Sequence, residues 1–505
     1  MVALTALPAG VAGSQASPYL PNDDIAYNYV DALMSRGLLR GLSALERPYN
    51  VRRVRAALDS AGRLEHGRIA ASYMDALSHA LRRFELRRAR DTTDRLPFRA
   101  RATFDVYTTA QTSGLRELMR ADWEEQVHPG AAGYFVMGAG HIAGSVRATL
   151  DQRLGKDPEF SRIKDRDVSA RTEDAYLTGE WKYARVAYGR VARSWGPAGF
   201  SGLLVGDDAY TYDHLYARVG TDRVHIATVI AKLENYVLSP GVESSRYLSV
   251  HRLGFSRGAF EGGLSEAFVY SGVGRGLEFS LLNPLNVYSL SWRNEQTDGN
   301  MSFGGDFAWK SPRLGIYSAQ LLLDDIQIDQ CDTVCKEPSS YGYTLSAEGI
   351  PGPGHNRLFA SYTRVSNLAY HTPNISERYA IYLVGLGRGF SDYDEIRAGV
   401  DVAMVPRTPL KLYVAHRRQG QGDYRGPYPA PEDYGTTPGF LAGNVWTVNR
   451  LGVSGASLIG RDFQITGDIG INWSTNRFHV VDQNDRQAEG RVKLTWVPRW
   501  VIRFD

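Results

Sequence analysis

The chain has 505 residues, enough for roughly two or three ordinary domain cores. Its 58 basic and 55 acidic residues nearly balance, which argues against nucleic acid as a partner. The sequence has no continuous apolar stretch of the length that a transmembrane helix needs, so a helical membrane protein is excluded. A membrane β-barrel stays open, because its strands alternate and keep the average hydropathy low.

Residues 1–17 open the chain with an apolar run that ends in small residues, Ser14-Gln15-Ala16. Such a run is typical of the end of a secretory signal, although the positively charged start of a signal peptide is missing. A signal-peptide remnant and a disordered tail are both compatible with this segment.

Residues 18–92 have helical spacing and predict a small α-helical bundle of three short helices. Asn50 is well placed to cap the second helix, which begins at Val51. Arginine pairs at 82–83 and 87–88 fall on the outside of the third helix. They form either a solvated face or a contact with lipid phosphate or cell-wall polymer.

From residue 93 to residue 505 the hydrophobic period changes from helical to two. The segment "RVKLTW" is one example: it sets Val492, Leu494 and Trp496 against Arg491, Lys493 and Thr495. A soluble sandwich with charges this regular on one face would have no dry core. The pattern instead fits a sheet with one face in lipid and the other around a wet interior.

The connections between these strands alternate in length. Tight turns are expected at 311–313, 351–356, 406–409 and 460–462, and longer polar loops at 329–340, 366–377 and 418–444. Outer-membrane barrels have short turns in the periplasm and long loops outside. Aromatic residues near strand ends predict interfacial girdles: Trp309, Tyr341, Trp446, Trp473 and Trp496.

The fold class predicted is therefore mainly β: a transmembrane, antiparallel outer-membrane β-barrel of roughly 16–18 strands. The barrel occupies residues 93–505, and residues 18–92 form a periplasmic helical bundle. The predicted location is the bacterial outer membrane, with its lipid as one partner.

Catalytic constellations are missing from the sequence. Ser265 and Ser454 do not lie in G-x-S-x-G elbows, and the histidines and cysteines lack zinc spacing. We therefore expect no enzyme activity, no cofactor and no bound metal. Cys331 and Cys335 share one long loop, and in an oxidising envelope they predict a disulfide.

The loop 419–440 carries aromatic and arginine side chains among prolines. Its candidates for polysaccharide binding are Tyr424, Arg425, Tyr428 and Tyr434. Sugar rings stack on such aromatics, and arginine pairs with acidic groups. A stiffened, solvated loop explains the composition equally well.

Several segments, in order, resemble the capsule-assembly family of Wzi type, including its broad branch. They are "RSWGPAGFSGLLVGDDA" (193–209), "RYLSVHRLGF" (246–255), "GGLSEAFVYSG" (262–272), "SLLNPLNVY" (280–288), "DGNMSFGGDFAWK" (298–310) and "IYSAQLLLDDI" (316–326). The resemblance implies an outer-membrane barrel with a small periplasmic helical bundle. The best-studied branch of that family resembles a lectin that holds capsular polysaccharide at the cell surface.

Ten polar or aromatic positions of these motifs carry over as candidate lumen or binding residues: Arg193, Trp195, His251, Arg252, Glu266, Asn283, Asn300, Asp306, Gln320 and Asp324. They either bind a ligand or pair with one another inside a plugged barrel. Simple alternation puts Glu266 on the lipid side with Leu264 and Phe268. A bulge, or a position above the lipid band, would resolve that conflict.

Three functions are compatible with these observations. The first is a non-enzymatic surface protein that binds or anchors polysaccharide. The second is a porin-like channel for small solutes, and the third a structural or docking component that contacts other envelope proteins. Paired lumen charges, such as Arg397 with Asp401, are expected in all three. A blocked interior favours binding or docking, and an open one favours the channel.

Overall fold

The computed structural model describes residues 16–64, 66–86, 98–160, 168–294, 298–325 and 337–504. Most of the N-terminal run, the arginine pair 87–88, and Cys331 with Cys335 lie outside the described residues. Within the described ranges, the structure contains no helix that is both long and apolar enough to cross a membrane.

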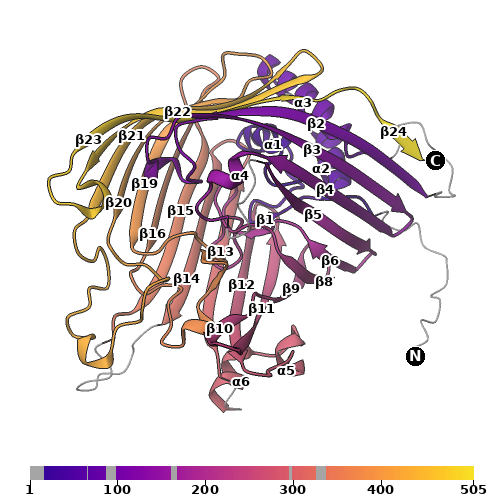
Figure 1. The fold of residues 1–505 in the computed structure, drawn as a ribbon. Helices are drawn as coiled ribbons and strands as arrows, with labels where there is room; N and C mark the ends of the chain where they lie inside the picture. The colour runs from indigo at the N-terminus through magenta and orange to yellow at the C-terminus, as the bar shows by residue number, and fades with distance from the viewer. Residues whose placement is uncertain are drawn as a thin grey trace, which may run out of the picture.

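The protein is a closed, antiparallel barrel of 18 strands, within the predicted range (Figure 1). The first half of the wall is β2 (Arg99–Gln111), β3 (Gln126–Ala139), β4 (Ile142–Asp151), β5 (Ser169–Glu180), β6 (Ala184–Arg190), β8 (Asp213–Gly220), β9 (Val224–Lys232), β11 (Val242–Arg257) and β12 (Phe260–Gly272). The second half is β13 (Asn300–Ser311), β14 (Gly315–Asp325), β15 (Ser340–Pro351), β16 (Arg357–Val365), β19 (Tyr393–Val402), β20 (Leu410–Gln419), β21 (Trp446–Ile459), β22 (Phe463–Thr475) and β23 (Asp485–Trp496).

The barrel closes where β23 pairs with β2, from Val106 opposite Trp496 to Gln111 opposite Arg491. Two short strands extend the wall: β10 (Tyr236–Ser239) beside β11, and β24 (Ile502–Phe504) beside β2. Two further pairs stand apart from the wall: β1 (Glu46–Arg47) with β7 (Ser194–Trp195), and β17 (Ala380–Ile381) with β18 (Val384–Gly385).

The remaining elements are helices. They are α1 (Ala26–Met34), α2 (Val51–Ala61), α3 (Arg68–Leu81), α4 (Arg153–Lys156), α5 (Phe279–Leu282) and α6 (Tyr288–Asn294), with short 3-10 turns η1 (Leu118–Arg120), η3 (Ile375–Glu377), η4 (Pro431–Asp433) and η5 (Arg477–His479). In Figure 1 the first three helices lie near the top of the view, and α5 and α6 lie at the bottom.

The alternation predicted for the wall is confirmed. On β23, Leu494 and Trp496 are exposed on the outside, whereas Arg491 and Lys493 line an interior cavity. Leu264 on β12 is 67% exposed, which is the burial expected of a side chain meant for lipid. The prediction that Trp446 belongs to an interfacial girdle is wrong, because Trp446 is 6% exposed and shares the inner face of β21 with Arg450.

Short and long connections also alternate as predicted. The short turns are 140–141, 181–183, 221–223, 258–259, 312–314, 352–356, 403–409 and 460–462, all at one end. The long connections are 112–125, 152–168, 191–212, 233–241, 273–299, 326–339, 366–392, 420–445 and 476–484, all at the other end. We call these the turn end and the loop end. The chain enters β2 and leaves β23 at the turn end.

The helices α1, α2 and α3 fill the turn end. Their apolar faces form one core with inward residues of the wall, such as Ala308, Ile316 and Leu458. Asn50 caps α2 as predicted, since its side chain accepts the backbone N–H of Arg52 at 3.0 Å. The bundle is thus a plug within the barrel; its exposure to the periplasm stays a prediction.

Arg83 corrects the expectation of a solvated or lipid-phosphate face on the third helix. Its guanidinium is buried and pairs with Asp24, and it donates to Asp105 on β2 at 2.6 Å. Arg82 beside it is exposed as predicted, so the correction concerns Arg83, which turns toward the wall. A buried arginine persists because two carboxylates compensate its charge.

The loop 191–212 fills the lumen from the other end. It reaches the helical region, where β7 pairs with β1 and the N–H groups of Gly196 and Ala198 donate to Leu45 and Ala44, both at 2.9 Å. Farther along, its residues 203–205 are buried against tyrosines of the loop 366–392. These contacts fill part of the lumen between the helices and the loop end.

Candidate functional site

The buried motif residues of the lumen pair mainly with one another. Arg252 on β11 donates to both carboxylate oxygens of Asp306 and, at 2.5 Å, to Glu46 of β1. His225 also contacts Glu46, at 2.9 Å. This cluster joins the segment before α2 to the wall. These motif residues thus pair with other residues of the protein, as expected of a plugged barrel.

Arg193, Trp195 and Gln320 hold the inward loop 191–212. The guanidinium of Arg193 lies 3.8 Å from the ring centre of Tyr216. The side-chain amide of Gln320 donates to the carbonyl of Trp195 at 2.6 Å and accepts the N–H of Leu203 at 3.0 Å. All three side chains are buried inside the protein.

Asp324 and Asn300 hold the loop 366–392. Asp324 accepts from Ser302 and from the N–H of Tyr370, the latter at 2.8 Å. The side chain of Asn300 donates to the carbonyl of Glu377 at 3.3 Å. Both residues therefore position a loop.

The expected pair between Arg397 and Asp401 is wrong. Asp401 pairs with Arg36, which follows α1, at 2.8 Å, and the guanidinium of Arg397 lies 3.7 Å from the ring centre of Tyr413. Arg397 and Asp401 lie on the same face of β19, but the carboxylate of Asp401 pairs with Arg36 of the plug.

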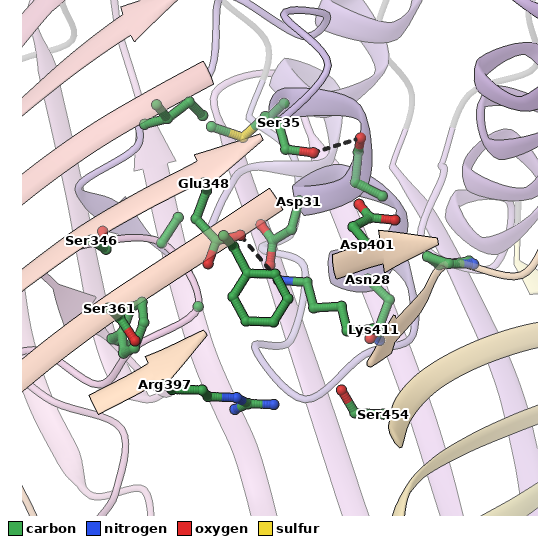
Figure 2. Close-up of a pocket in the computed structure, with 18 of the residues that line it drawn as sticks. Asn28, Asp31, Ser35, Ser346, Glu348, Ser361, Arg397, Asp401, Lys411 and Ser454 are labelled. Carbon is green, nitrogen blue, oxygen red and sulfur yellow. Dashed lines mark hydrogen bonds and ion pairs between the residues drawn. The ribbon is translucent and has the colours of Figure 1, made fainter. Parts of the chain in front are cut away.

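Beneath α1 lies an interior cavity of about 240 Å³ (Figure 2). Glu348 of β15 and Lys411 of β20 point toward one another across it and pair at 3.1 Å. A larger cavity of about 690 Å³ lies nearer the loop end and carries many charges of both signs. Both cavities are lined by Phe200, Ser361 and Arg397.

His251, Glu266 and Asn283 lie away from the lumen. Glu266 is on the outer face of β12, as alternation predicts, and it pairs with His251 of β11 at 3.1 Å. The segment with α5 and α6 covers this pair on the outside of the barrel. Asn283 is exposed on that segment, where its side chain accepts the N–H of Leu285.

The four residues of the loop 419–440 that were predicted to bind polysaccharide lie in different environments. Tyr424 is 1% exposed, and its hydroxyl is held by the backbone of residues 385 and 389, so its ring offers no stacking surface to a sugar. Tyr428 and Tyr434 pack edge to face, with Tyr428 bonded to Glu337 and packed on His371. Arg425 alone reaches a cavity.

That cavity, of about 380 Å³, lies where four long connections meet at the loop end. We call this cavity the cup. Its lining residues are Arg120, Phe390, Ser391, Gln419, Gly420, Gln421, Gly422, Asp423, Arg425, Trp446, Phe478 and His479. Its floor is buried at Ser391, Gln419 and Trp446, whereas Gln421, Asp423 and Phe478 are exposed on its rim. Its size is in the range of small-molecule sites, about 300–1,000 Å³.

Arg120 is the arginine of the cup without a salt bridge. Its guanidinium stacks on Phe390 at 3.6 Å, and among the described residues it forms no salt bridge, although Glu117 and Asp423 attract it from farther away. Glu117 pairs instead with Arg417, at 2.6 Å. Burial, and after it repulsion from Arg417, lowers the pKa of Arg120 to about 9. A bound anion would relieve this cost.

The other arginine of the cup is already compensated. Arg425 donates to Asp423 at 2.8 Å. Burial alone would raise the pKa of Asp423, but the hydrogen bonds from Arg425 lower it. The pair is a polar rim, and the arginine without a salt bridge is Arg120.

Two buried donors of the cup floor are also unsatisfied. Across the part of the chain that the structure describes, Trp446 Nε1 and Ser391 Oγ find no hydrogen-bond partner. A buried donor costs about 1–3 kcal/mol when neither water nor a ligand bonds to it. Aromatic rings, a cation without a salt bridge and two free donors therefore lie together in the cup.

The backbone around the cup is held in unusual conformations. Phe478 and His479 have positive φ angles of 54° and 64°, which non-glycine residues seldom adopt. Asp392 accepts the N–H groups of Gly422, Leu441 and Ala442 and so anchors the loop 420–445. Strain of this kind persists only where the surroundings enforce it.

Sequence reasoning missed Arg120, Trp446 and Phe478. Arg120 and Phe478 come from two different connections and Trp446 from the start of β21, so no local motif unites them. The glycine spacing in "QGQGD" (419–423) was a usable signal, because a Cβ on Gly422 would lie 1.9 Å from Asn367 Oδ1. For metals, the described ranges contain no group of three His, Cys, Asp or Glu placed to bind an ion.

No protein-family model matches the sequence, and a search of curated proteins gives no match. Among solved structures, the chain is similar to Wzi, described as an outer membrane protein involved in group 1 capsule assembly in Escherichia coli and a carbohydrate-binding β-barrel. The identity is 14%, the TM-score 0.63, and the match covers 97% of this chain and 100% of that one. The chain has the Wzi fold.

Two further solved structures match more weakly. OccAB4 of Acinetobacter baumannii is 9% identical with a TM-score of 0.43, covering 82% of this chain and 100% of that one. OpdK of Pseudomonas aeruginosa is 11% identical with a TM-score of 0.45, covering 81% and 99%. The Wzi fold, with its outward apolar belt, places this chain in the bacterial outer membrane.

Proposed function

We propose that this protein binds an acidic surface polysaccharide in the cup at the loop end and does not turn it over. The observation that carries the proposal is the unpaired guanidinium of Arg120 beside the free donors of Trp446 and Ser391. A carboxylate on a sugar ring would compensate the cation. The ring faces of Phe390 and Phe478 supply stacking surface.

The filled lumen supports binding over transport. The helical plug occupies the turn end, and the loops 191–212 and 366–392 occupy the middle. Such an interior favours a binding or docking role. Wzi is described as a carbohydrate-binding barrel, which agrees with this proposal but is a property of that protein.

Binding of purified protein to polysaccharide from the source cell tests the proposal. Arg120→Gln removes the cation, and Trp446→Phe keeps the ring but removes Nε1. Charge-assisted hydrogen bonds contribute about 1.5–3 kcal/mol, so Arg120→Gln should weaken binding by roughly 10- to 100-fold. Binding should also weaken in high salt.

Arg499→Ala is the matched control, because it removes an exposed arginine at the turn end that pairs with Asp462. It should leave binding unchanged. Equal weakening by Arg499→Ala and Arg120→Gln would mean that net charge, and not the cup, attracts the glycan.

A channel is the second candidate, and the charged cavity of about 690 Å³ in the lumen is the observation that favours it. Conductance of single barrels in planar bilayers separates the two functions. A blocked lumen predicts no steady conductance. Steady ion passage, together with no binding of any surface glycan, would replace the binding proposal with a channel.

A further inference from the structure

Residues 273–294, which we call the outer hairpin, join β12 to the segment before β13 and contain α5 and α6. Figure 1 shows these helices at the loop end, beside the ends of β11 and β12. On β12, Leu264 faces outward, so Phe268 and Tyr270 also face outward. Both are nevertheless fully buried, because Leu281 and Tyr288 of the hairpin pack on them.

The wall is built to hold the outer hairpin. The carboxylate of Glu266 accepts the N–H of Tyr288 and the hydroxyl of Ser289, both at 2.8 Å, and contacts His251 at 3.1 Å. The ring of Tyr288 lies 4.2 Å from that of His251. A charged pair on the outer wall would be costly against acyl chains. The hairpin removes that cost by covering and bonding the pair.

The height of this contact falls within the apolar belt. Glu266 lies six positions after Phe260, which begins β12 at the turn end. Six residues of a strand tilted by about 35–45° rise about 15 Å, inside a belt about 25 Å tall. The hairpin therefore sits against the half of the belt nearer the loop end, which is the outer-leaflet side.

The other face of the outer hairpin is apolar and uncovered. Phe279 is 87% exposed and Leu285 77% exposed, and Leu277 and Leu290 are also exposed. The hairpin's anchor on the wall, Glu266, lies two positions along β12 from Leu264, which is exposed on the apolar belt. Trp292, followed by the exposed Arg293, has the amphipathic character of interfacial residues.

We infer that the outer hairpin is inserted in the outer leaflet of the membrane, with Leu277, Phe279, Leu285 and Leu290 among acyl chains and Trp292 at the headgroups. The occupant of its apolar face is lipid, because the hairpin is anchored on the lipid-facing wall at the height of the apolar belt. The hairpin thus widens the barrel's membrane contact on one side. This inference is independent of the proposed glycan site.

Photo-crosslinking in living cells tests the inference. The crosslinking residue p-benzoylphenylalanine replaces Phe279 or Leu285, with Leu264 as the lipid-facing reference and Thr436, exposed in the loop 420–445, as the reference outside the membrane. Positions 279 and 285 should yield lipid adducts at a level close to that of position 264. Position 436 should yield few.

Other outcomes would overturn it. Adducts of protein mass at positions 279 and 285 would show that a partner or a second copy covers the hairpin. Lipid adducts at position 264 without any at 279 or 285 would show that the hairpin stands in water.

A protease assay on intact cells gives a second readout. The wild-type hairpin should resist cleavage, since lipid and wall cover it. Glu266→Leu removes the acceptor for Tyr288 and Ser289 but suits the lipid face, so the barrel should fold and the hairpin should be cut. If the wild-type hairpin is cleaved as fast as the hairpin of the Glu266→Leu variant, the inserted position is wrong.

Discussion

Arg252→Met is the substitution with the largest expected effect on the attachment of the plug. Arg252 is almost fully buried, and it is the partner that both Asp306 and Glu46 share. Its loss leaves Asp306 buried without a counter-charge, whereas Glu46 keeps its contact with His225 at 2.9 Å. Removal of one partner from a buried ion pair costs about 3–5 kcal/mol.

A double variant separates the stranded charge from the lost contacts. Arg252→Met with Asp306→Asn removes both charges, and neutral replacement of a buried pair is often close to neutral in stability. The double variant should therefore recover much of the loss. Arg499→Ala is the surface control, because its pair with Asp462 is exposed and such pairs add little to stability.

The assay is urea unfolding of purified barrel in detergent, followed by the shift in gel migration between folded and unfolded forms. The expected order of the free energy of unfolding is wild type, then Arg499→Ala, then the double variant, with Arg252→Met lowest. If Arg252→Met is as stable as Arg499→Ala, or if the double variant is less stable than the single, the reasoning about a stranded buried carboxylate is wrong.

The remaining predictions concern location, topology, redox state and the cup. The protein should fractionate with the outer membrane and migrate differently before and after heating in detergent gels; a folded form recovered without detergent would contradict this. A cysteine at Ala71, exposed on α3, should escape labelling on intact cells, because we expect the plug to face the periplasm; labelling would contradict that orientation. Cys331 and Cys335 should be bridged, so denatured, unreduced protein should show no free thiol. Gly422→Val should reduce glycan binding while the barrel still folds, since a side chain there collides with Asn367; unchanged binding would remove the loop 420–445 from the site.

The buried position of Tyr424 also changes how the loop should be tested. Its hydroxyl joins three backbone groups, so Tyr424→Ala is expected to loosen the loop as well as any ligand contact. Arg425→Ala is cleaner, because Arg425 lies on the cup and bonds only to a rim carboxylate and its own loop. Weakened binding with an unchanged melting curve is the result that would implicate the cup.

The outward and inward faces of the strands were predictable because side-chain alternation is a local property of extended backbone. Leu494 against Lys493 needed no knowledge of the rest of the chain. Glu266 was likewise correctly placed on the outer face. Its cover was not predictable, because the covering segment is a later stretch whose path depends on packing.

The sequence by itself determined the barrel, its two ends and the helical start, since these depend on periods and on connection lengths. The tertiary structure decided which charges pair, as when Arg36 rather than Arg397 takes Asp401. It also decided the cup, by bringing together Arg120 and Phe478 from two connections and Trp446 from the start of β21. The physical reason is that alternation fixes only the face on which a side chain lies. Its partner is decided by which loops and helices fill the interior once the barrel has closed.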